Sequence, residues 1–171
     1  MIALSTLFWI FVVVFAMMGS MRGWSKEMLV TFSIILGIFV IAVILQFIPF
    51  MQAYLEAGGE ARQFAVRAVI LVLFTFFGYQ SPRLQRLSEA VVRERFQDSL
   101  LGIVVGALNG YLLIGSLLYY LHQFNYPFAW VTAPGGEVLN FMAYMAPAWL
   151  TVPAVYFAVA VAFTFVVVVL I

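Results

Sequence analysis

Five apolar stretches, separated by shorter polar segments, divide the chain. Their expected bounds are Ile2–Gly19, Met28–Pro49, Phe64–Tyr79, Leu100–Leu121 and Val152–Ile171. A bilayer core of about 30 Å is crossed by about 20 helical residues, so each stretch meets or approaches the length of a membrane span. The stretches lack the period-two alternation of barrel strands, and a helix satisfies its own backbone in lipid. The pattern predicts an all-α integral membrane protein in which residues 1–171 form a single transmembrane domain of about five helices.

The connections between these stretches differ in kind. Ser20–Glu27 is expected to form a tight turn, and Gln52–Gln63 a polar loop broken by two glycines. Residues 82–98 place apolar positions at helical spacing among charged ones, which predicts an amphipathic helix lying in the membrane interface. Glu137–Met145 is a second candidate for a short helix at the membrane surface.

Positive charge is distributed unevenly over the connections. The first and third connections together carry six Lys and Arg residues, the second connection and its flank carry two, and the fourth carries none. Because Lys and Arg favour cytoplasmic loops, this bias places the basic loops in the cytoplasm and the N-terminus outside. The residues expected to anchor the chain at the interfaces are Arg22, Gly23, Lys26, Arg67, Arg83, Arg86, Arg93 and Arg95.

The composition supports the membrane assignment and limits the kinds of partner that the protein can bind. Hydrophobic residues make up 66% of the chain and charged residues 9%, against about 25% charged residues in average soluble domains. From Ser99 to Ile171 the only charged side chain is Glu137. The net charge is +1 and no basic stripe with interleaved aromatics occurs, so no nucleic-acid partner is expected. The expected partners are the lipid bilayer and other transmembrane proteins, in a homo- or hetero-oligomer.

The sequence offers little that points to catalysis. The chain has no cysteine and one histidine, which excludes the common metal sites, and it lacks the usual nucleotide-binding, hydrolase and metalloprotease motifs. We therefore expect no enzyme, no metal and no cofactor. His122 is a weak candidate for a pigment or metal ligand, and pigment or lipid contact is expected only for a subunit of a larger complex. The acidic residues are all expected in connections, which argues against an ion-coupled transporter.

A stripe of glycines marks the fourth apolar stretch. Gly102, Gly106 and Gly110 recur every four residues, so they lie along one face of a helix and let another backbone approach closely. This face is either an oligomerisation surface or a packing surface for another helix of the same chain. Asn109 lies beside the stripe and is expected to hydrogen-bond across helices.

Arg67 lies about one turn inside the third apolar stretch. A charge inside a membrane span is a candidate functional residue. The plainer expectation is that Arg67 snorkels to the interface or pairs with Glu56 or Glu60 of the preceding connection.

Two segments carry a family resemblance. One is Gly19–Glu27, an Arg-Gly turn followed by a glutamate that opens the second span, and the other is Phe96–Gly110, an acidic residue before the glycine-striped span. In this order, with a short span and a basic amphipathic helix between them, they resemble the colicin V production protein (CvpA) family of bacterial inner-membrane proteins. The resemblance implies a bacterial cytoplasmic-membrane location and a role in colicin V production or envelope function, and it implies no catalytic residue.

Three functions are consistent with these patterns. The first is a non-enzymatic CvpA-family protein that acts through helix packing in membrane assembly or envelope function. The second is a small accessory subunit of a large photosynthetic or respiratory complex. The third, and the weakest, is a small channel or transporter.

Overall fold

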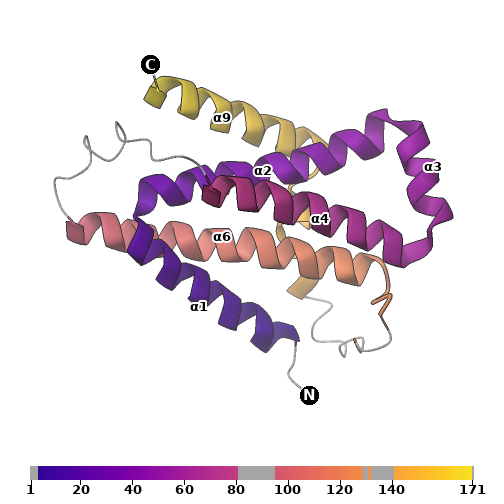
Figure 1. Cartoon of the computed structure of the whole chain (residues 1–171), viewed down its shortest axis with the longest axis horizontal. Coiled ribbons are helices and arrows are strands. Elements are labelled where there is room, and N and C mark those ends of the chain that lie inside the picture. The colour runs from indigo at the N-terminus through magenta and orange to yellow at the C-terminus, as the bar shows by residue number, and fades with distance from the viewer. Residues whose placement is uncertain (1–3, 81–94, 129–130, 132–140, 171) are drawn as a thin grey trace.

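The computed structural model describes residues 4–80, 95–128, 131 and 141–170, and Figure 1 shows them as a bundle of helices. The bundle comprises α1 Leu4–Arg22, α2 Trp24–Phe47, α3 Pro49–Ala57, α4 Gly59–Gln80, α6 Arg95–Gln123, α8 Ala146–Trp149 and α9 Val152–Leu170. No strand occurs among the described residues, so the predicted all-α fold is confirmed.

Four helices, α1, α2, α4 and α6, are long and apolar enough to cross a membrane. The helix α9 matches the fifth expected span in position, but its apolar stretch among the residues searched, Val152–Thr164, is shorter than the others. At 29 residues, α6 extends over about 44 Å, which exceeds the hydrocarbon thickness and is long enough to reach both interfaces.

The expected bounds of two connections are too wide, because the helices continue into them. The expected polar loop Gln52–Gln63 is instead the end of α3 and the start of α4, with Gly58 between them. The expected turn Ser20–Glu27 reduces to one residue, Gly23, between α1 and α2. Gly23 has φ +84°, a left-handed conformation that glycine adopts without steric cost and that reverses the chain in a single step.

Other expectations lie outside the described residues. Most of the amphipathic helix at 82–98 does so, with Arg83, Arg86 and Arg93, while its last residues, 95–98, form the start of α6. Glu137 and the first part of the expected surface helix, residues 137–140, are also outside. The described remainder is helical at 141–142 and turns at 143–145, just before α8.

The helix α6 organises the bundle. It packs against α1 along its length and also contacts α2, α4 and α8, while α9 packs on α2 (Figure 1). The largest group of buried apolar side chains joins these helices through Ile34 of α2, Leu71 of α4, Leu112 of α6 and Val155 of α9.

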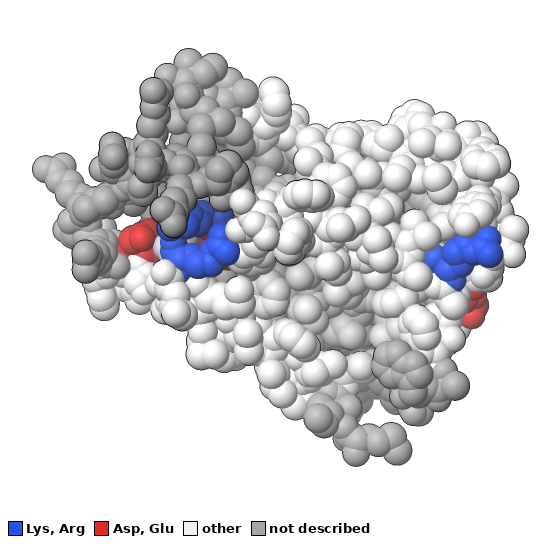
Figure 2. All heavy atoms as spheres, in the orientation of Figure 1, with Lys and Arg blue, Asp and Glu red and all other residues white. Residues whose placement is uncertain are grey.

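Charged side chains lie at opposite ends of the bundle. On the face drawn in Figure 2 they form two groups at the ends of the long axis, separated by uncharged surface. One end holds Arg22, Lys26 and Asp98, and the other holds Glu60 and Arg62. The bundle therefore has the charge distribution of a protein whose long axis crosses the bilayer.

The glycine stripe of α6 faces α1. A Cβ atom added at Gly106 would collide with the backbone carbonyl of Phe15, and one added at Gly102 with the carbonyl of Gly19. Gly19 supplies the reciprocal contact, because its own added Cβ would meet Gly102. Of the two alternatives left open by the sequence, the structure places this stripe against a helix of the same chain, where it allows two backbones to approach closely.

We expect Gly106→Ala to destabilise the protein by about 1–3 kcal/mol, because the new methyl group meets rigid backbone of α1 and the helices must separate. The measurement is unfolding of the purified protein in mixed micelles, followed by tryptophan fluorescence. Gly115→Ala on the same helix is the matched control, since its methyl group meets the flexible end of Met145. Equal stability of both variants would contradict the proposed close contact.

Candidate functional site: a buried polar cluster

Glu27 lies at the centre of a buried polar cluster. It is in the first turn of α2 and its side chain is 0% exposed. The prediction that every acidic residue lies in a connection is therefore wrong for Glu27, because α2 begins three residues before it. A buried carboxylate is stable only where charges or donors replace its water.

Asn109 of α6 supplies donors to Glu27. Its Nδ2 atom lies 2.8 Å from Glu27 Oε2 and 3.0 Å from the backbone oxygen of Glu27. Thr31, one turn further along α2, donates its hydroxyl proton to Asn109 Oδ1 at 2.6 Å. Asn109 is itself 0% exposed, so this amide joins α6 to α2 inside the protein, as expected for a cross-helix hydrogen bond.

Arg22, at the end of α1, provides the positive charge. Its Nε atom lies 3.0 Å from Glu27 Oε1, forming an ion pair. Its guanidinium stacks on the ring of Tyr79 from α4, with 4.4 Å between Cζ and the ring centroid. The Tyr79 hydroxyl donates to Glu27 Oε2 over a long 3.4 Å. Through these contacts the carboxylate of Glu27 links α1, α2, α4 and α6.

The start of α6 holds the turn between α1 and α2. The carboxylate of Asp98 accepts a hydrogen bond from the backbone N–H of Trp24 at 3.1 Å, which caps an otherwise unpaired donor at the start of α2. Its other oxygen packs so close to Gly23 that a Cβ there would collide with it. Ser99 donates to the backbone oxygen of Ser20 at 3.0 Å. The left-handed turn and Asp98 therefore depend on each other.

Two other predicted anchor residues lie at this end of the bundle. Lys26 is exposed on the first turn of α2. Arg95 begins α6. Arg22 is only partly exposed and neutralises Glu27.

Arg67 lies at the other end of the bundle and has a different environment. It is 7% exposed, donates from Nη1 to the backbone oxygen of Gln63 at 2.9 Å, and stacks on Phe124 with 4.5 Å from Cζ to the ring centroid. The expected pairing with Glu56 or Glu60 is not found, since Glu60 instead accepts a hydrogen bond from Asn125. Within the described part of the chain, no carboxylate forms an ion pair with Arg67.

His122 lies near the end of α6, beside Tyr126. The Tyr126 hydroxyl is 3.3 Å from His122 Nδ1, and burial raises the pKa of Tyr126. Among the described residues, no group of three His, Asp or Glu side chains is arranged to hold a metal ion. His122 therefore makes a local polar contact at the end of the helix.

The two segments that carry the family resemblance lie against each other here. The first segment supplies Gly19, Arg22, Gly23 and Glu27. The second segment supplies the residues that contact them, from Asp98 to Asn109. The model of the family described as colicin V production protein matches residues 4–134.

The chain belongs to the colicin V production protein family. The match covers α1, α2, α3, α4 and α6 and ends before α8 and α9. No curated protein and no solved structure matches the chain. Membership and four apolar helices indicate a multi-pass membrane protein of the bacterial inner membrane.

Sequence reasoning missed the cluster around Glu27 although it singled out most of its members. Arg22, Gly23 and Asn109 are predicted as anchors or packing residues, while Tyr79 and Thr31 are not singled out at all. A usable signal exists in Glu27 and Thr31, which are one helical turn apart and so share a face of α2. Their partner Asn109 is 82 residues from Glu27 in the sequence, and no local pattern identifies it.

We expect Asn109→Leu to lower the free energy of unfolding by about 2–3 kcal/mol, because it leaves the carboxylate of Glu27 without its best donor. Thr31→Val should cost about 1 kcal/mol in the wild type. In the Asn109→Leu background Thr31→Val should cost less, since the Thr31 hydroxyl then bonds only to the backbone oxygen of Glu27 in its own helix, at 3.1 Å. The measurement is a double-mutant cycle of unfolding in mixed micelles.

Thr75→Val is the matched control for this cycle. Thr75 is also buried on a spanning helix, but its hydroxyl donates to Leu71 of its own helix at 2.8 Å. Its substitution should cost less than Thr31→Val and should add to Asn109→Leu independently. Fully additive effects of Asn109→Leu and Thr31→Val would show that Asn109 and Thr31 do not form one network.

Proposed function

We propose that this family member is a non-enzymatic membrane protein that acts through helix packing in membrane assembly or envelope function. The observation that carries the proposal is the network around Glu27. Its carboxylate binds the amide of Asn109 and the guanidinium of Arg22, which joins three helices. Polar groups held in this way support a stable bundle and leave its outer faces for contacts with lipid or with other membrane proteins.

The outer face of α1 is apolar and exposed, as contacts with lipid or with other membrane proteins require. Trp9, Val13 and Met17 recur every four residues and are each more than half exposed. They lie on α1 while Gly19 packs against α6, so the helix carries one intramolecular face and one outward apolar face. An apolar stripe of this kind is suited to the bilayer and to a neighbouring transmembrane helix.

We propose the orientation in which the cluster around Glu27 lies at the cytoplasmic side and α3 at the outer side. The support is the excess of Lys and Arg in the first and third connections, which include Arg22 and Lys26. In this orientation the N-terminus lies outside.

The packing function predicts that the protein, extracted from its native membrane in mild detergent, migrates in blue-native gels as a discrete assembly larger than one chain. The double variant Trp9→Ala/Met17→Ala should form less of that assembly, while the folded monomer remains. Thr75→Val, a buried substitution, is the control that should leave it intact. A wild-type protein found only as a monomer would contradict the proposal, and migration within a large complex would favour the accessory-subunit function.

A flux measurement tests the competing transporter function. Glu27 is buried within a helix, and buried carboxylates are the groups that ion and proton transport uses. Liposomes containing the wild-type protein should show proton and potassium leakage equal to that of protein-free liposomes. Glu27→Gln should leave this background unchanged. Leakage through the wild type that Glu27→Gln lowers would overturn the packing function in favour of ion transport.

The orientation predicts the labelling of single cysteines, which the chain permits because it has none of its own. A membrane-impermeant maleimide should label Gln52→Cys on α3 from the outer side of spheroplasts. It should label Gln97→Cys at the start of α6 only after the membrane is opened. Both side chains are exposed, so accessibility within the protein does not bias the comparison. The reverse pattern would place the N-terminus in the cytoplasm.

A further inference from the structure

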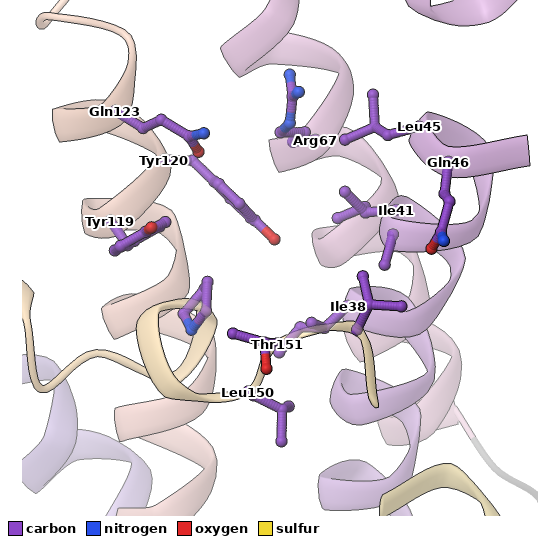
Figure 3. Close-up of a pocket in the computed structure, with 13 residues that line it drawn as sticks. Ile38, Ile41, Leu45, Gln46, Arg67, Tyr119, Tyr120, Gln123, Leu150 and Thr151 are labelled. Carbon is purple, nitrogen blue, oxygen red and sulfur yellow. The ribbon is translucent and has the colours of Figure 1, made fainter. Parts of the chain in front are cut away.

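A cavity of about 470 Å³ lies between α2, α4, α6 and the segment that leads into α9. Figure 3 shows its lining residues, with Arg67 of α4 and Gln123 of α6 toward one end and Ile38 of α2 and Leu150 toward the other. The hydroxyl of Tyr120 points into the space between α6 and the other two helices (Figure 3). Gln46 and Thr151 also line the cavity and are exposed, so it opens to the outside of the bundle.

Arg67 brings an uncompensated positive charge to this cavity. Its guanidinium has five N–H donors, and among the described residues it makes one hydrogen bond, to the backbone of Gln63. The stacking on Phe124 fixes one face of the guanidinium plane and leaves donors at its edge. A charge that is 7% exposed and lacks a carboxylate partner requires an anion from elsewhere to offset its desolvation.

The contrast with Arg22 shows that this arrangement is specific to one end of the bundle. Arg22, at the opposite end, is neutralised by Glu27 of its own chain at 3.0 Å. Arg62 lies on the same helix as Arg67, is exposed, and donates to the backbone oxygen of Tyr54 at 3.2 Å. Arg67 alone among these three combines deep burial, a cavity and the absence of a described acidic partner.

The rest of the cavity wall is polar at one end and apolar at the other, which suits an amphipathic ligand. Gln123 lies with Arg67 at the polar end, while Ile38, Ile41 and Leu150 provide an apolar wall beyond it (Figure 3). Arg67 lies five residues, about 7.5 Å, beyond the exposed Arg62 on α4, so its long side chain starts inside the apolar part of the helix within reach of the headgroups at that end. A small soluble anion would engage only the polar end and would leave the apolar wall unfilled.

We propose that this cavity binds an anionic phospholipid of the bilayer, with its phosphate on Arg67 and an acyl chain along the apolar wall. The guanidinium offers the planar pair of donors that a phosphate accepts. Gln123 contributes further donors at the same end. The site is separate from the cluster around Glu27 and does not depend on the packing function.

Native mass spectrometry of the delipidated full-length protein tests the site, with phosphatidylglycerol as the probe. The wild type should bind one phosphatidylglycerol molecule more tightly than any further ones, and more tightly than phosphatidylcholine. Arg67→Gln should weaken that first binding event by about tenfold or more, as expected for the loss of a charge-assisted contact. Arg67→Lys, which keeps the charge, should retain part of the affinity. Arg62→Gln removes one charge from the same helix and should bind as the wild type does.

A second pair of variants tests the acyl-chain part without altering the charge. Ala42 lines the cavity, so Ala42→Phe should fill the apolar wall and weaken phosphatidylglycerol binding while Arg67 remains. Ala65 is exposed on α4, and Ala65→Phe adds the same bulk outside the cavity. Unfolding of each variant in micelles shows whether it is folded, and only folded variants are compared.

Several outcomes would overturn the proposal. Equal affinity of the wild type and a folded Arg67→Gln variant would exclude Arg67 as the headgroup contact. Equal affinity for phosphatidylcholine and phosphatidylglycerol would exclude selection by charge. Displacement of the lipid by millimolar inorganic phosphate, together with unchanged binding by Ala42→Phe, would show a site for a small anion instead.

Discussion

The carboxylate of Glu27 imposes the strongest constraint on this bundle. It is fully buried in a protein whose surroundings are largely hydrocarbon, so water cannot solvate it. Its partners come from three other helices: Arg22 from α1, Tyr79 from α4 and Asn109 from α6. The positions of these four helices are thereby tied to one charge. Removing any one partner leaves a buried charge or donor that no neighbouring water can satisfy, which costs more than the loss of an ordinary packing contact.

The glycine contacts and the polar cluster depend on each other. Close approach of α1 and α6 at Gly19 and Gly106 brings the start of α6 against the turn at Gly23. Asp98 can then cap α2 through Trp24, and Asn109 reaches Glu27 from the same helix. A larger side chain in the stripe would separate the helices and lengthen these hydrogen bonds. Small residues and buried polar residues thus both hold the helices together, since hydrophobic forces alone provide little drive for helices to associate in lipid.

The sequence predicts the membrane class and the apolar cores of the helices because both follow from the composition of a continuous segment. Helix ends are predicted less well, since Glu27 and Glu60 look like connection residues until the helices are seen to extend through them. The neighbours of Arg67 are also mispredicted. Proximity in sequence favours Glu56 or Glu60, whereas the fold places Phe124 and Gln63 against the guanidinium and leaves the acids elsewhere. The pairing of Asn109 with Glu27 depends on tertiary contacts, which no local spacing encodes.

Arg22 and Arg67 differ in how their charges are compensated at the two ends of the protein. At one end Arg22 pairs with Glu27 of its own chain, so the charge of Arg22 is neutralised internally. At the other end Arg67 is more deeply buried than Arg22 and faces a cavity with polar and apolar walls. The cost of burying a charge applies to both residues. A fold that offsets this cost internally for Arg22 and leaves it open for Arg67 requires a counter-anion from its surroundings. In a bilayer, the anions at that depth are the phosphates of lipid headgroups.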